Sequence, residues 1–215
     1  MVVTKDAPQE YNNFKIPGTG CDVYGPQRLA LAVHLRDDVL PFIKKSFFIE
    51  NGTLLGAWRN GKFIPHDDDF DYGVLLDNNH DEKESIKSIL TIIRSKLRPC
   101  YECRLISTYA DKIEVYDPAL GSYQLSPKYG GADYHYVTVD LQFYRTTADN
   151  KHEQMYYLGA SPPVLESVVI LPLGEIVLEG ETFPAPNKTH EFLVANYGSL
   201  DPAAKYNSKT GKYHL

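Results

Sequence analysis

Cysteine is scarce in this sequence, and the few cysteines do not form a disulfide framework. The 215 residues include 3 cysteines, at positions 21, 100 and 103. An odd and sparse count is not typical of a small disulfide-stabilised scaffold. Cys100 and Cys103 form one C-x-x-C pair, but no second pair completes the four ligands of a structural zinc site. Two ordinary thiols are therefore the favoured interpretation over a metal site.

Long apolar runs are also missing. No stretch of the sequence approaches the ~20 apolar residues that a membrane-spanning helix requires. Residues 1–13 are polar and include acidic side chains, unlike a secretory signal peptide. We therefore expect a soluble protein with no membrane span. A cytoplasmic location is favoured, with a secretory lumen as the alternative if the chain is a fragment.

Basic residues are outnumbered by acidic ones. Lys and Arg total 22 against 28 Asp and Glu, so the formal net charge is −6. General nucleic-acid binding usually needs a basic face, and nucleic acid is not expected as a partner. A nucleotide ligand is still compatible with this charge, because a divalent cation neutralises phosphate groups where protein cations do not.

The apolar spacing that is present predicts one main domain of mixed helices and strands. Helices are expected from Pro26 to about Ile43 and over residues 52–58, 81–97 and 188–197. Strands are expected over residues 46–50, 72–76, 105–109, 112–116 and 134–144, with a strand-rich C-terminal part. Because the elements do not alternate as regular βαβ units, the predicted class is α+β with a mixed β-sheet flanked by helices.

The composition of the two ends sets the expected boundaries of this domain. Residues 1–24 are rich in Pro, Gly and Asn and are predicted to form an extended N-terminal arm. Residues 25–198 form the predicted main domain. Residues 199–215 are predicted to be a polar C-terminal tail.

An acidic run lies at the centre of the sequence. Asp67, Asp69 and Asp71 are spaced two apart and lead into the apolar residues 72–76. Alternate side chains of an extended chain share one face, so the three carboxylates are expected to converge. Such carboxylates repel one another unless a cation lies among them, and oxygen-only ligands suit Mg²⁺ or Mn²⁺. A solvated acidic loop is the simpler alternative, but the apolar flanks of the run favour the metal site.

A fourth carboxylate interrupts a later apolar strand. Asp140 lies within V-T-V-D-L-Q-F-Y, residues 137–144. It is either a half-buried polar position on an edge strand or a third metal ligand that faces Asp69 and Asp71 from a neighbouring strand.

Basic side chains flank the acidic run. Arg59 and Lys62 are candidates to bind phosphate oxygens, Arg59 through a bidentate contact. For Lys62, charge balance on a loop is an equally good explanation. His66 directly precedes the run, and it is a candidate substrate-binding or proton-transfer group, although a loop histidine without such a role is the better default.

The motif that joins these residues resembles a known family. Residues 52–71 read G-T-L-L-G-x-x-R-x-G-x-F-I-P-x-D-D-D-x-D, which resembles the signature of the LicD family. That family includes bacterial phosphocholine transferases, fukutin and fukutin-related protein. Fainter similarity continues through L-P-L-G-E at 171–175 and into the helix that ends at residues 196–198. The resemblance covers roughly residues 40–198, with His66 and Tyr72 as departures from the usual Trp and aliphatic residues.

The resemblance implies a nucleotidyltransferase-type fold and a metal-dependent phosphotransferase. Its elements are a small-residue turn on a helix (Gly52 and Thr53), an Asp-x-Asp and a carboxylate on a later strand. Asp69, Asp71 and Asp140 are then the expected ligands of Mg²⁺ or Mn²⁺, and Asp67 or Asp140 the expected base. Gly52 and Thr53 would let backbone N–H groups approach phosphate. The implied donor is a nucleotide-diphosphate conjugate, CDP-linked by preference, and the implied acceptor is a glycan hydroxyl.

Other functions fit the same residues. A nucleotidyltransferase would use the same carboxylates and leave a nucleoside monophosphate on its acceptor. A non-catalytic sugar- or metal-binding domain of the same fold is disfavoured, because it has no need of clustered charge. A glycosyltransferase with an Asp-x-Asp is disfavoured by the G-T-L-L-G segment, which is unlike a dinucleotide-fold turn.

Overall fold

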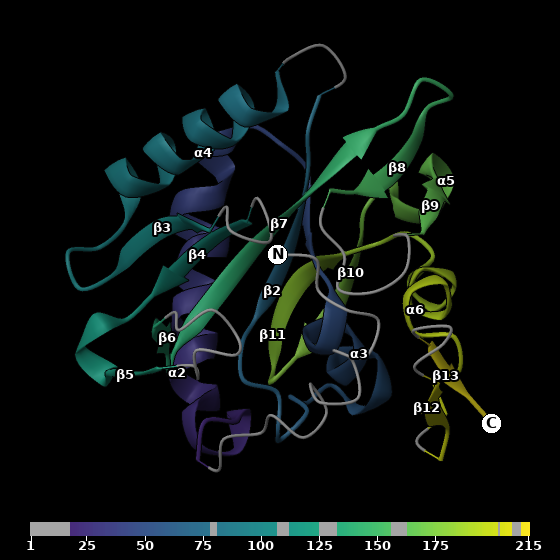
Figure 1. Cartoon of the computed structure of the whole chain (residues 1–215), viewed down its shortest axis with the longest axis horizontal. Helices are drawn as coiled ribbons and strands as arrows, with labels where there is room; N and C mark the ends of the chain where they lie inside the picture. Colours follow the sequence, from purple (N-terminus) through teal and green to yellow (C-terminus); the bar gives the residue numbers. More distant parts are fainter. Residues whose placement is uncertain are drawn as a thin grey trace.

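A mixed β-sheet flanked by helices forms the centre of the molecule (Figure 1). The computed structural model describes residues 18–77, 81–106, 112–124, 133–155, 163–201, 203–207 and 212–215. Most of the predicted arm, residues 1–17, lies outside the described residues, as do residues 107–109 of one predicted strand.

The main sheet has seven strands among the described residues. Five of them follow the order β1-β2-β7-β4-β3, and β8 and β9 extend the sheet from β7. Strands β2 and β7 run parallel, whereas the other pairs of this sheet are antiparallel. This arrangement confirms the predicted mixed sheet. The strands are β1 (Phe47–Ile49), β2 (Asp71–Leu75), β3 (Glu102–Ile106), β4 (Lys112–Tyr116), β7 (Thr138–Thr146), β8 (Lys151–Gln154) and β9 (Val164–Glu166).

Helices and small hairpins surround this sheet (Figure 1). The helices are α2 (Cys21–His34), α3 (Asn51–Asn60), α4 (Glu82–Lys96), α5 (Ser167–Ile170) and α6 (Thr189–Tyr197). The end of α2 continues through a π-helical segment, Leu35–Val39, into a 3₁₀ turn, Leu40–Ile43. Three two-stranded sheets pair β5 (Ser122–Gln124) with β6 (Asp133–His135), β10 (Gly174–Leu178) with β11 (Glu181–Ala185), and β12 (Lys205–Asn207) with β13 (Lys212–His214).

The first helix begins earlier than predicted. α2 starts at Cys21, inside the predicted arm, and Pro26 lies within it rather than at its start. The backbone N–H of Cys21 donates to the carbonyl of Asp67 at 2.8 Å, and that of Asp22 to the carbonyl of Pro65 at 3.0 Å. These donors would otherwise be unsatisfied at a helix start. The acidic loop thus supplies the partners that extend the helix, and local sequence does not show them.

The C-terminal segment also folds back onto the domain. Part of the predicted tail forms the β12–β13 hairpin. The N–H of Ser199 donates to the carbonyl of Tyr213 at 2.9 Å, and the rings of Tyr197 and Tyr213 lie 6.4 Å apart. This hairpin therefore packs beside the end of α6.

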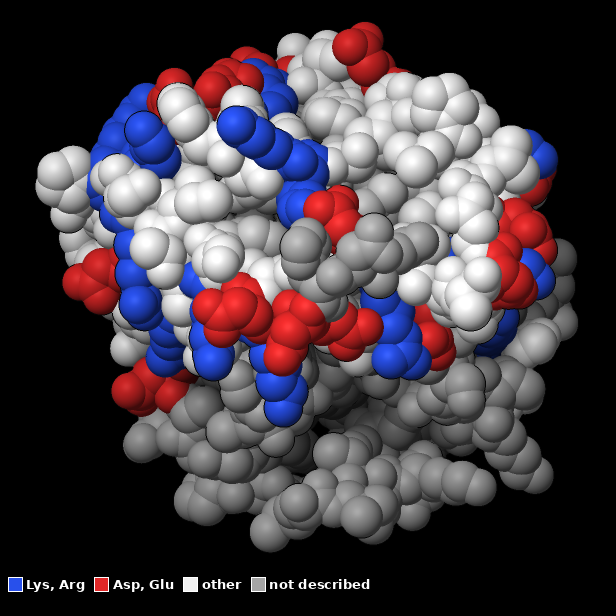
Figure 2. Space-filling view, turned by 90° about the horizontal axis from the view of Figure 1, so that it is seen from above, with Lys and Arg blue, Asp and Glu red and all other residues white. Residues whose placement is uncertain are grey.

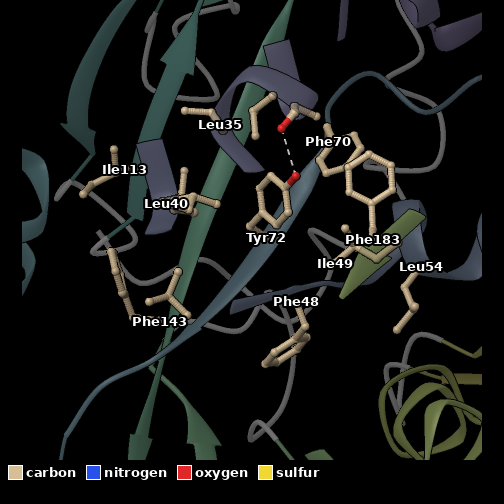
Figure 3. Packing of buried hydrophobic residues seen from close by; sticks show 14 of the residues in the cluster. Leu35, Leu40, Phe48, Ile49, Leu54, Phe70, Tyr72, Ile113, Phe143 and Phe183 are labelled. Atoms are coloured by element: carbon tan, nitrogen blue, oxygen red, sulfur yellow. Dashed lines mark hydrogen bonds between the residues drawn. The ribbon is translucent and has the colours of Figure 1, made fainter. Parts of the chain in front are cut away.

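One part of the hydrophobic core lies between the sheet and α2, and the core also includes residues of α3, α4 and α6 (Figure 3). Tyr72 of β2 is fully buried there, and its hydroxyl donates to the carbonyl of Ala32 in α2 at 3.0 Å. The Tyr72 ring lies 5.0 Å from that of Phe70, which in turn lies 5.4 Å from that of Phe183 in β11. Burying each large apolar side chain contributes about 1.5–3 kcal/mol, so this cluster fixes β2 against α2.

The opposite face of β2 is polar at one end and aromatic at the other. Gly73 faces this side, and a Cβ built on it would come within 2.8 Å of the Phe48 ring. The glycine therefore lets Phe48 and Tyr144 pack across the strand, where their rings lie 5.5 Å apart. Asp71, two residues earlier, lies on this same face because side chains alternate along a strand.

The exposed surface carries charges of both signs. Figure 2 shows acidic and basic side chains interspersed over the described part of one face. Exposed ion pairs of the chain include Lys87 with Glu84 at 3.8 Å. None of the described helices has the length and apolar character needed to cross a membrane.

Candidate active site

The parallel pairing of β2 and β7 brings distant carboxylates together. Asp71 begins β2, and Asp140 is its register partner in β7. Paired residues of adjacent strands point to the same face of a sheet. Carboxylate oxygens of Asp69, Asp71 and Asp140 all lie within 4.8 Å of one another. The structure thus brings together the three side chains that the sequence predicts as metal ligands.

The acidic loop before β2 provides a second group of carboxylates. Oxygens of Asp67, Asp68 and Asp69 also lie within 4.8 Å of one another. Asp69 belongs to both groups, so it connects the loop to the strand pair. Asp68, which the sequence interpretation left out of the site, is therefore a neighbour of the predicted ligands.

The clustered charge disfavours ionisation of these aspartates. Burial raises the pKa of Asp69 well above its ordinary value, and repulsion by Asp67, Asp68 and Asp140 adds to the effect. Burial, with repulsion by Asp69 and Asp140, likewise raises the pKa of Asp71. A cation among these oxygens would reverse the penalty, because it stabilises the charged form of each carboxylate.

The surroundings of one oxygen of Asp140 indicate whether the carboxylate cluster is suited to a cation. The Asp140 side chain is 3% exposed. Its Oδ2 accepts a hydrogen bond from Lys112 Nζ, whereas its Oδ1 is buried and receives none within the described part of the chain. A buried polar atom without a partner is costly. Together with the oxygens of Asp69 and Asp71, Oδ1 offers the hard donor set that Mg²⁺ or Mn²⁺ prefers.

Lys112 is a charged residue of this site that the sequence interpretation missed. It begins β4 and is 9% exposed. It pairs with Asp140, and its charge opposes the rise in the pKa of Asp69. The alternation of charged and apolar residues in K-I-E-V-Y was its only signal in the sequence. That alternation reads equally well as a solvated face of an ordinary strand.

The start of α3 contacts the acidic cluster directly. A Cβ built on Gly52 would lie 2.4 Å from Asp67 Oδ2, so only glycine leaves room for the carboxylate there. Thr53 Oγ1 accepts a hydrogen bond from the backbone N–H of Asp71 at 3.0 Å. The positive end of the helix dipole favours an anion at this position. In this structure the anion beside Gly52, where the sequence predicts phosphate, is Asp67.

A buried arginine holds the loop that carries the aspartates. Arg28 of α2 is fully buried and donates to the carbonyl of Asp67 at 3.3 Å and to that of Tyr136 at 2.6 Å. Its charge opposes the burial that raises the pKa of Asp68. Arg28 therefore ties the acidic loop to α2 and to the segment before β7. This role could not be predicted from the sequence, because a single arginine on a helix is usually exposed.

The flanking basic residues have partners away from the acidic cluster. Arg59 lies in the last turn of α3, and its guanidinium donates to the carbonyl of Leu200 at 3.3 Å. Seven residues separate it from Gly52, which corresponds to about 10 Å along a helix. Lys62 pairs with Glu179 at 2.9 Å. Their proposed contacts with phosphate stay predictions.

His66 and the cysteine pair lie outside the carboxylate groups. His66 is exposed on the loop before the aspartates. Within the described ranges, the groups with metal-binding geometry contain neither a histidine nor a cysteine. Cys100 is exposed, Cys103 is partly buried, and both are free thiols. A substrate-binding role for His66 stays a prediction.

Several tyrosines stand beside the acidic loop. The rings of Tyr24 and Tyr136 are stacked at 5.5 Å, and that of Tyr123 lies 5.4 Å from Tyr136. The Tyr123 hydroxyl hydrogen-bonds to Asp68, and burial together with Asp68 and Asp69 raises the pKa of Tyr123. The aromatic rings therefore adjoin the carboxylates on the side of β5 and β6.

Comparison with known protein families identifies the family to which this chain belongs. Residues 44–188 match the family described as "LicD/FKTN/FKRP, nucleotidyltransferase domain". The match covers more than half of the sequence, and it includes all four aspartates predicted as catalytic. The chain belongs to the LicD family of nucleotidyltransferase-fold domains. No curated protein matches the sequence.

Solved structures similar to this chain are nucleotidyltransferases at low identity. The lincosamide antibiotic adenylyltransferase LnuA, bound to lincomycin, has 14% identity and a TM-score of 0.41, with 78% of this chain and 83% of that chain covered. The Cid1 poly(U) polymerase bound to MgGTP has 16% identity and a TM-score of 0.32, with 65% and 37% covered. A CdnE c-di-GMP synthase from Capnocytophaga granulosa has 16% identity and a TM-score of 0.33, with 65% and 40% covered. The family assignment rests on the sequence match.

Proposed function

We propose that this chain is a metal-dependent phosphotransferase. It would move a phosphate-linked alcohol or sugar from a nucleotide-diphosphate donor, CDP-linked by preference, to a glycan hydroxyl. The observation that carries the proposal is the convergence of Asp69, Asp71 and Asp140 around the buried, unbonded Oδ1 of Asp140. Membership of the LicD family supports the transferase class.

The three carboxylates would hold Mg²⁺ or Mn²⁺. A bound divalent ion neutralises charge on the donor phosphates and on the leaving nucleotide. The protein fixes the ligands in advance: β2 and β7 set Asp71 against Asp140, and the loop held by Arg28 sets Asp69. This preorganisation avoids the cost of assembling like charges during the reaction.

Asp67 is the proposed base for the acceptor hydroxyl. Both oxygens of Asp140 have other uses in this scheme, since Oδ2 accepts from Lys112 and Oδ1 would be the oxygen that holds the cation. Asp67 lies beside Asp68 and Asp69 but outside the proposed ligand set. A carboxylate within reach of the attacking hydroxyl can accept its proton as the bond to phosphorus forms.

The start of α3 is the proposed contact for the donor phosphates. Gly52 has no side chain, and its backbone faces the acidic cluster. Helix N-termini bind anions through free N–H groups and the helix dipole. Asp67 lies beside Gly52 in this structure, so its carboxylate would have to move when phosphate binds there.

A thermal-shift panel tests the donor and the metal together. CDP-, UDP- and GDP-linked ligands would each be added with and without Mn²⁺. We expect a CDP-type ligand to raise Tm only in the presence of Mn²⁺, because binding to the folded state alone stabilises it. Stabilisation by the same ligand in EDTA would contradict the metal-dependent site.

Analysis of the reaction product separates the two transferase functions. The family description names a nucleotidyltransferase domain, so transfer of the nucleotide itself is the second candidate. A phosphotransferase releases the nucleoside monophosphate and leaves the phospho-alcohol on the acceptor. A nucleotidyltransferase instead leaves the monophosphate on the acceptor, and mass spectrometry of the acceptor distinguishes the two. A chain that binds donor but releases neither product would be the non-catalytic domain.

A further inference from the structure

A closed circuit of hydrogen bonds passes through Asp71. Gln142 Nε2 donates to Asp71 Oδ1 at 2.9 Å, and Gln154 Nε2 donates to Gln142 Oε1 at 2.7 Å. Gln154 Nε2 also lies 3.4 Å from Oε1 of Glu50. The backbone N–H of Glu50 returns to the carbonyl of Asp71 at 3.2 Å. The circuit therefore passes from β2 through β7 and β8 to the residue that precedes α3.

The circuit gives the amide of Gln142 a fixed direction. A glutamine amide has a donor end and an acceptor end, and only the donor end can face a carboxylate favourably. Gln154 donates to the acceptor end of Gln142, which turns its NH₂ group toward Asp71. Without Gln154, the carbonyl end of Gln142 would lose this partner, and the hydrogen bond to Asp71 would have to hold the amide by itself.

The far end of the circuit lies in a buried and closely packed part of the fold. Gln154 is 4% exposed, and Glu50 is fully buried. The Tyr144 hydroxyl donates to Glu50 Oε2, and the Tyr144 ring packs on Phe48. Partners packed in this way hold a polar network in one arrangement.

We infer that Gln142 is a positioning residue for the metal ligand Asp71, and that Gln154 acts through Gln142 by fixing its amide. This inference rests on the proposed function, because it takes Asp71 as a ligand. The hydrogen bond from Gln142 engages Oδ1 of Asp71 and would leave Oδ2 available to hold the cation. Hydrogen-bond partners behind a metal ligand typically contribute about 10–100-fold to metal affinity.

Titration with Mn²⁺ alone tests both parts. Isothermal titration would compare the Kd for Mn²⁺ of the whole chain with those of Gln142→Met, Gln154→Met and the double variant. Methionine keeps the length of the side chain and removes its hydrogen bonds. We expect the Kd to rise about tenfold or more in Gln142→Met and less in Gln154→Met. The double variant should match Gln142→Met, because within the described circuit Gln154 reaches the carboxylate of Asp71 through Gln142, whereas the path through Glu50 ends at the backbone carbonyl of Asp71.

Phe143→Leu is the matched control. Phe143 is the neighbour of Gln142 in β7, but it is buried in the core on the opposite face. We expect it to lower Tm while leaving the Kd for Mn²⁺ unchanged. If Phe143→Leu weakens Mn²⁺ binding as much as Gln142→Met at a similar loss of Tm, general loosening of β7 explains the effect and the inference is overturned.

The remaining outcomes distinguish a failure of the positioning role from a failure of the proposed function. Wild-type affinity in Gln142→Met overturns the positioning role alone, and independent, additive effects of the two glutamines overturn the role of Gln154. If Gln142→Met does not fold, the Kd of Gln154→Met for Mn²⁺ is the test. Wild-type affinity in that variant would show that Gln154 does not act on Asp71 through Gln142. Failure of the wild-type chain to bind Mn²⁺, or wild-type affinity in Asp71→Asn, instead overturns the proposed function.

Discussion

The two faces of β2 and β7 are equally buried but chemically opposite. On one face, Tyr72 and Leu141 are each 0% exposed and pack toward α2. On the other face, Asp71 and Asp140 are 4% and 3% exposed and lie among carboxylates and amides. Burial alone therefore does not distinguish the core from the site. The difference is that one face satisfies its atoms by packing, whereas the other leaves Asp140 Oδ1 without a partner among the described residues.

This contrast shows how one strand can contribute both to the stability of the fold and to the candidate site. Side chains alternate along a strand, so each residue of β7 belongs to only one of the two faces. The apolar face supplies the free energy that holds β2 beside β7. That free energy offsets the repulsion between the like charges that lie close together on the polar face. Substitutions on the two faces should therefore separate activity from stability.

The largest expected effect follows from removing a ligand on the polar face. Asp69→Ala or Asp71→Ala should lower turnover by roughly 10²–10³-fold or more, as loss of a main electrostatic group does. Either change should also abolish the stabilisation by a CDP-type ligand with Mn²⁺. Because repulsion is relieved, Tm without metal should stay equal or rise in Asp69→Ala. The gain should be smaller in Asp71→Ala, which also removes the acceptor of the hydrogen bond from Gln142. Normal ligand binding by either variant would show that the site assignment is wrong.

Asp140→Asn should have the next largest effect. The amide keeps the size of the side chain, but it removes a charge from the proposed ligand set and a partner from Lys112. We expect turnover to fall about 10²-fold, measured by release of the nucleoside monophosphate. Near-normal turnover would make Asp140 a structural residue of β7.

Leu141→Ala tests the apolar face at the adjacent position. Deletion of a fully buried leucine side chain costs about 2–5 kcal/mol of unfolding free energy. Urea unfolding should show this loss, while turnover per folded molecule stays close to wild type. A fall in turnover as large as that of Asp140→Asn would show that the two faces do not act independently.

The pH dependence of stability should identify the buried acid behind the site. Burial raises the pKa of Glu50 from 4.5 to about 8, although hydrogen bonds from Tyr144 and Gln154 oppose the rise. Its folded pKa exceeds its unfolded one, so the stability it contributes is fully present below the unfolded value and is lost as pH rises through about 8. The metal-free chain should thus lose Tm between about pH 5 and pH 9. Glu50→Gln should make this loss smaller, and the part that remains is due to Asp69 and Asp71, whose pKa values are also raised. An unchanged pH profile in this variant would contradict the assignment.

The smallest effect is expected at an exposed pair outside both faces. Lys62 pairs with Glu179, and its side chain is 63% exposed. Exposed ion pairs contribute about 0–1 kcal/mol, so Lys62→Ala should change unfolding free energy by less than about 1 kcal/mol. Turnover at saturating donor should be unchanged. A raised KM for the donor at constant stability would instead assign Lys62 to phosphate binding, as the sequence predicts.

Local patterns in the sequence predicted much of the fold. The structure confirms three of the predicted elements as β1, α4 and β4. Their signals were a short apolar run at 46–50, an apolar helix face over 81–97 and a strand-like segment at 112–116. The predicted start of α2 was wrong, because the first N–H groups of this helix donate to carbonyls of a loop that is distant in the sequence.

The sequence predicted the acidic residues of the candidate site and the start of α3, but not the side chains that hold the aspartates. The aspartates stood out because clustered charge and a charge inside an apolar strand are both costly. Gln142, Gln154, Lys112 and Arg28 did not stand out, since polar residues at such positions are usually solvent-exposed. Their roles depend on the pairing of β2, β7, β4 and β8, and a single sequence does not contain that register.

The parallel pairing of β2 with β7 also has a consequence for how the chain folds. The strands are joined by a long crossover that includes α4, β3 and β4. Closing so long a loop costs entropy before any native contact between β2 and β7 repays it, which slows folding. Cation binding should consequently appear only in the last kinetic phase of refolding, after the crossover has closed, and Mn²⁺ should leave the rate of that phase unchanged.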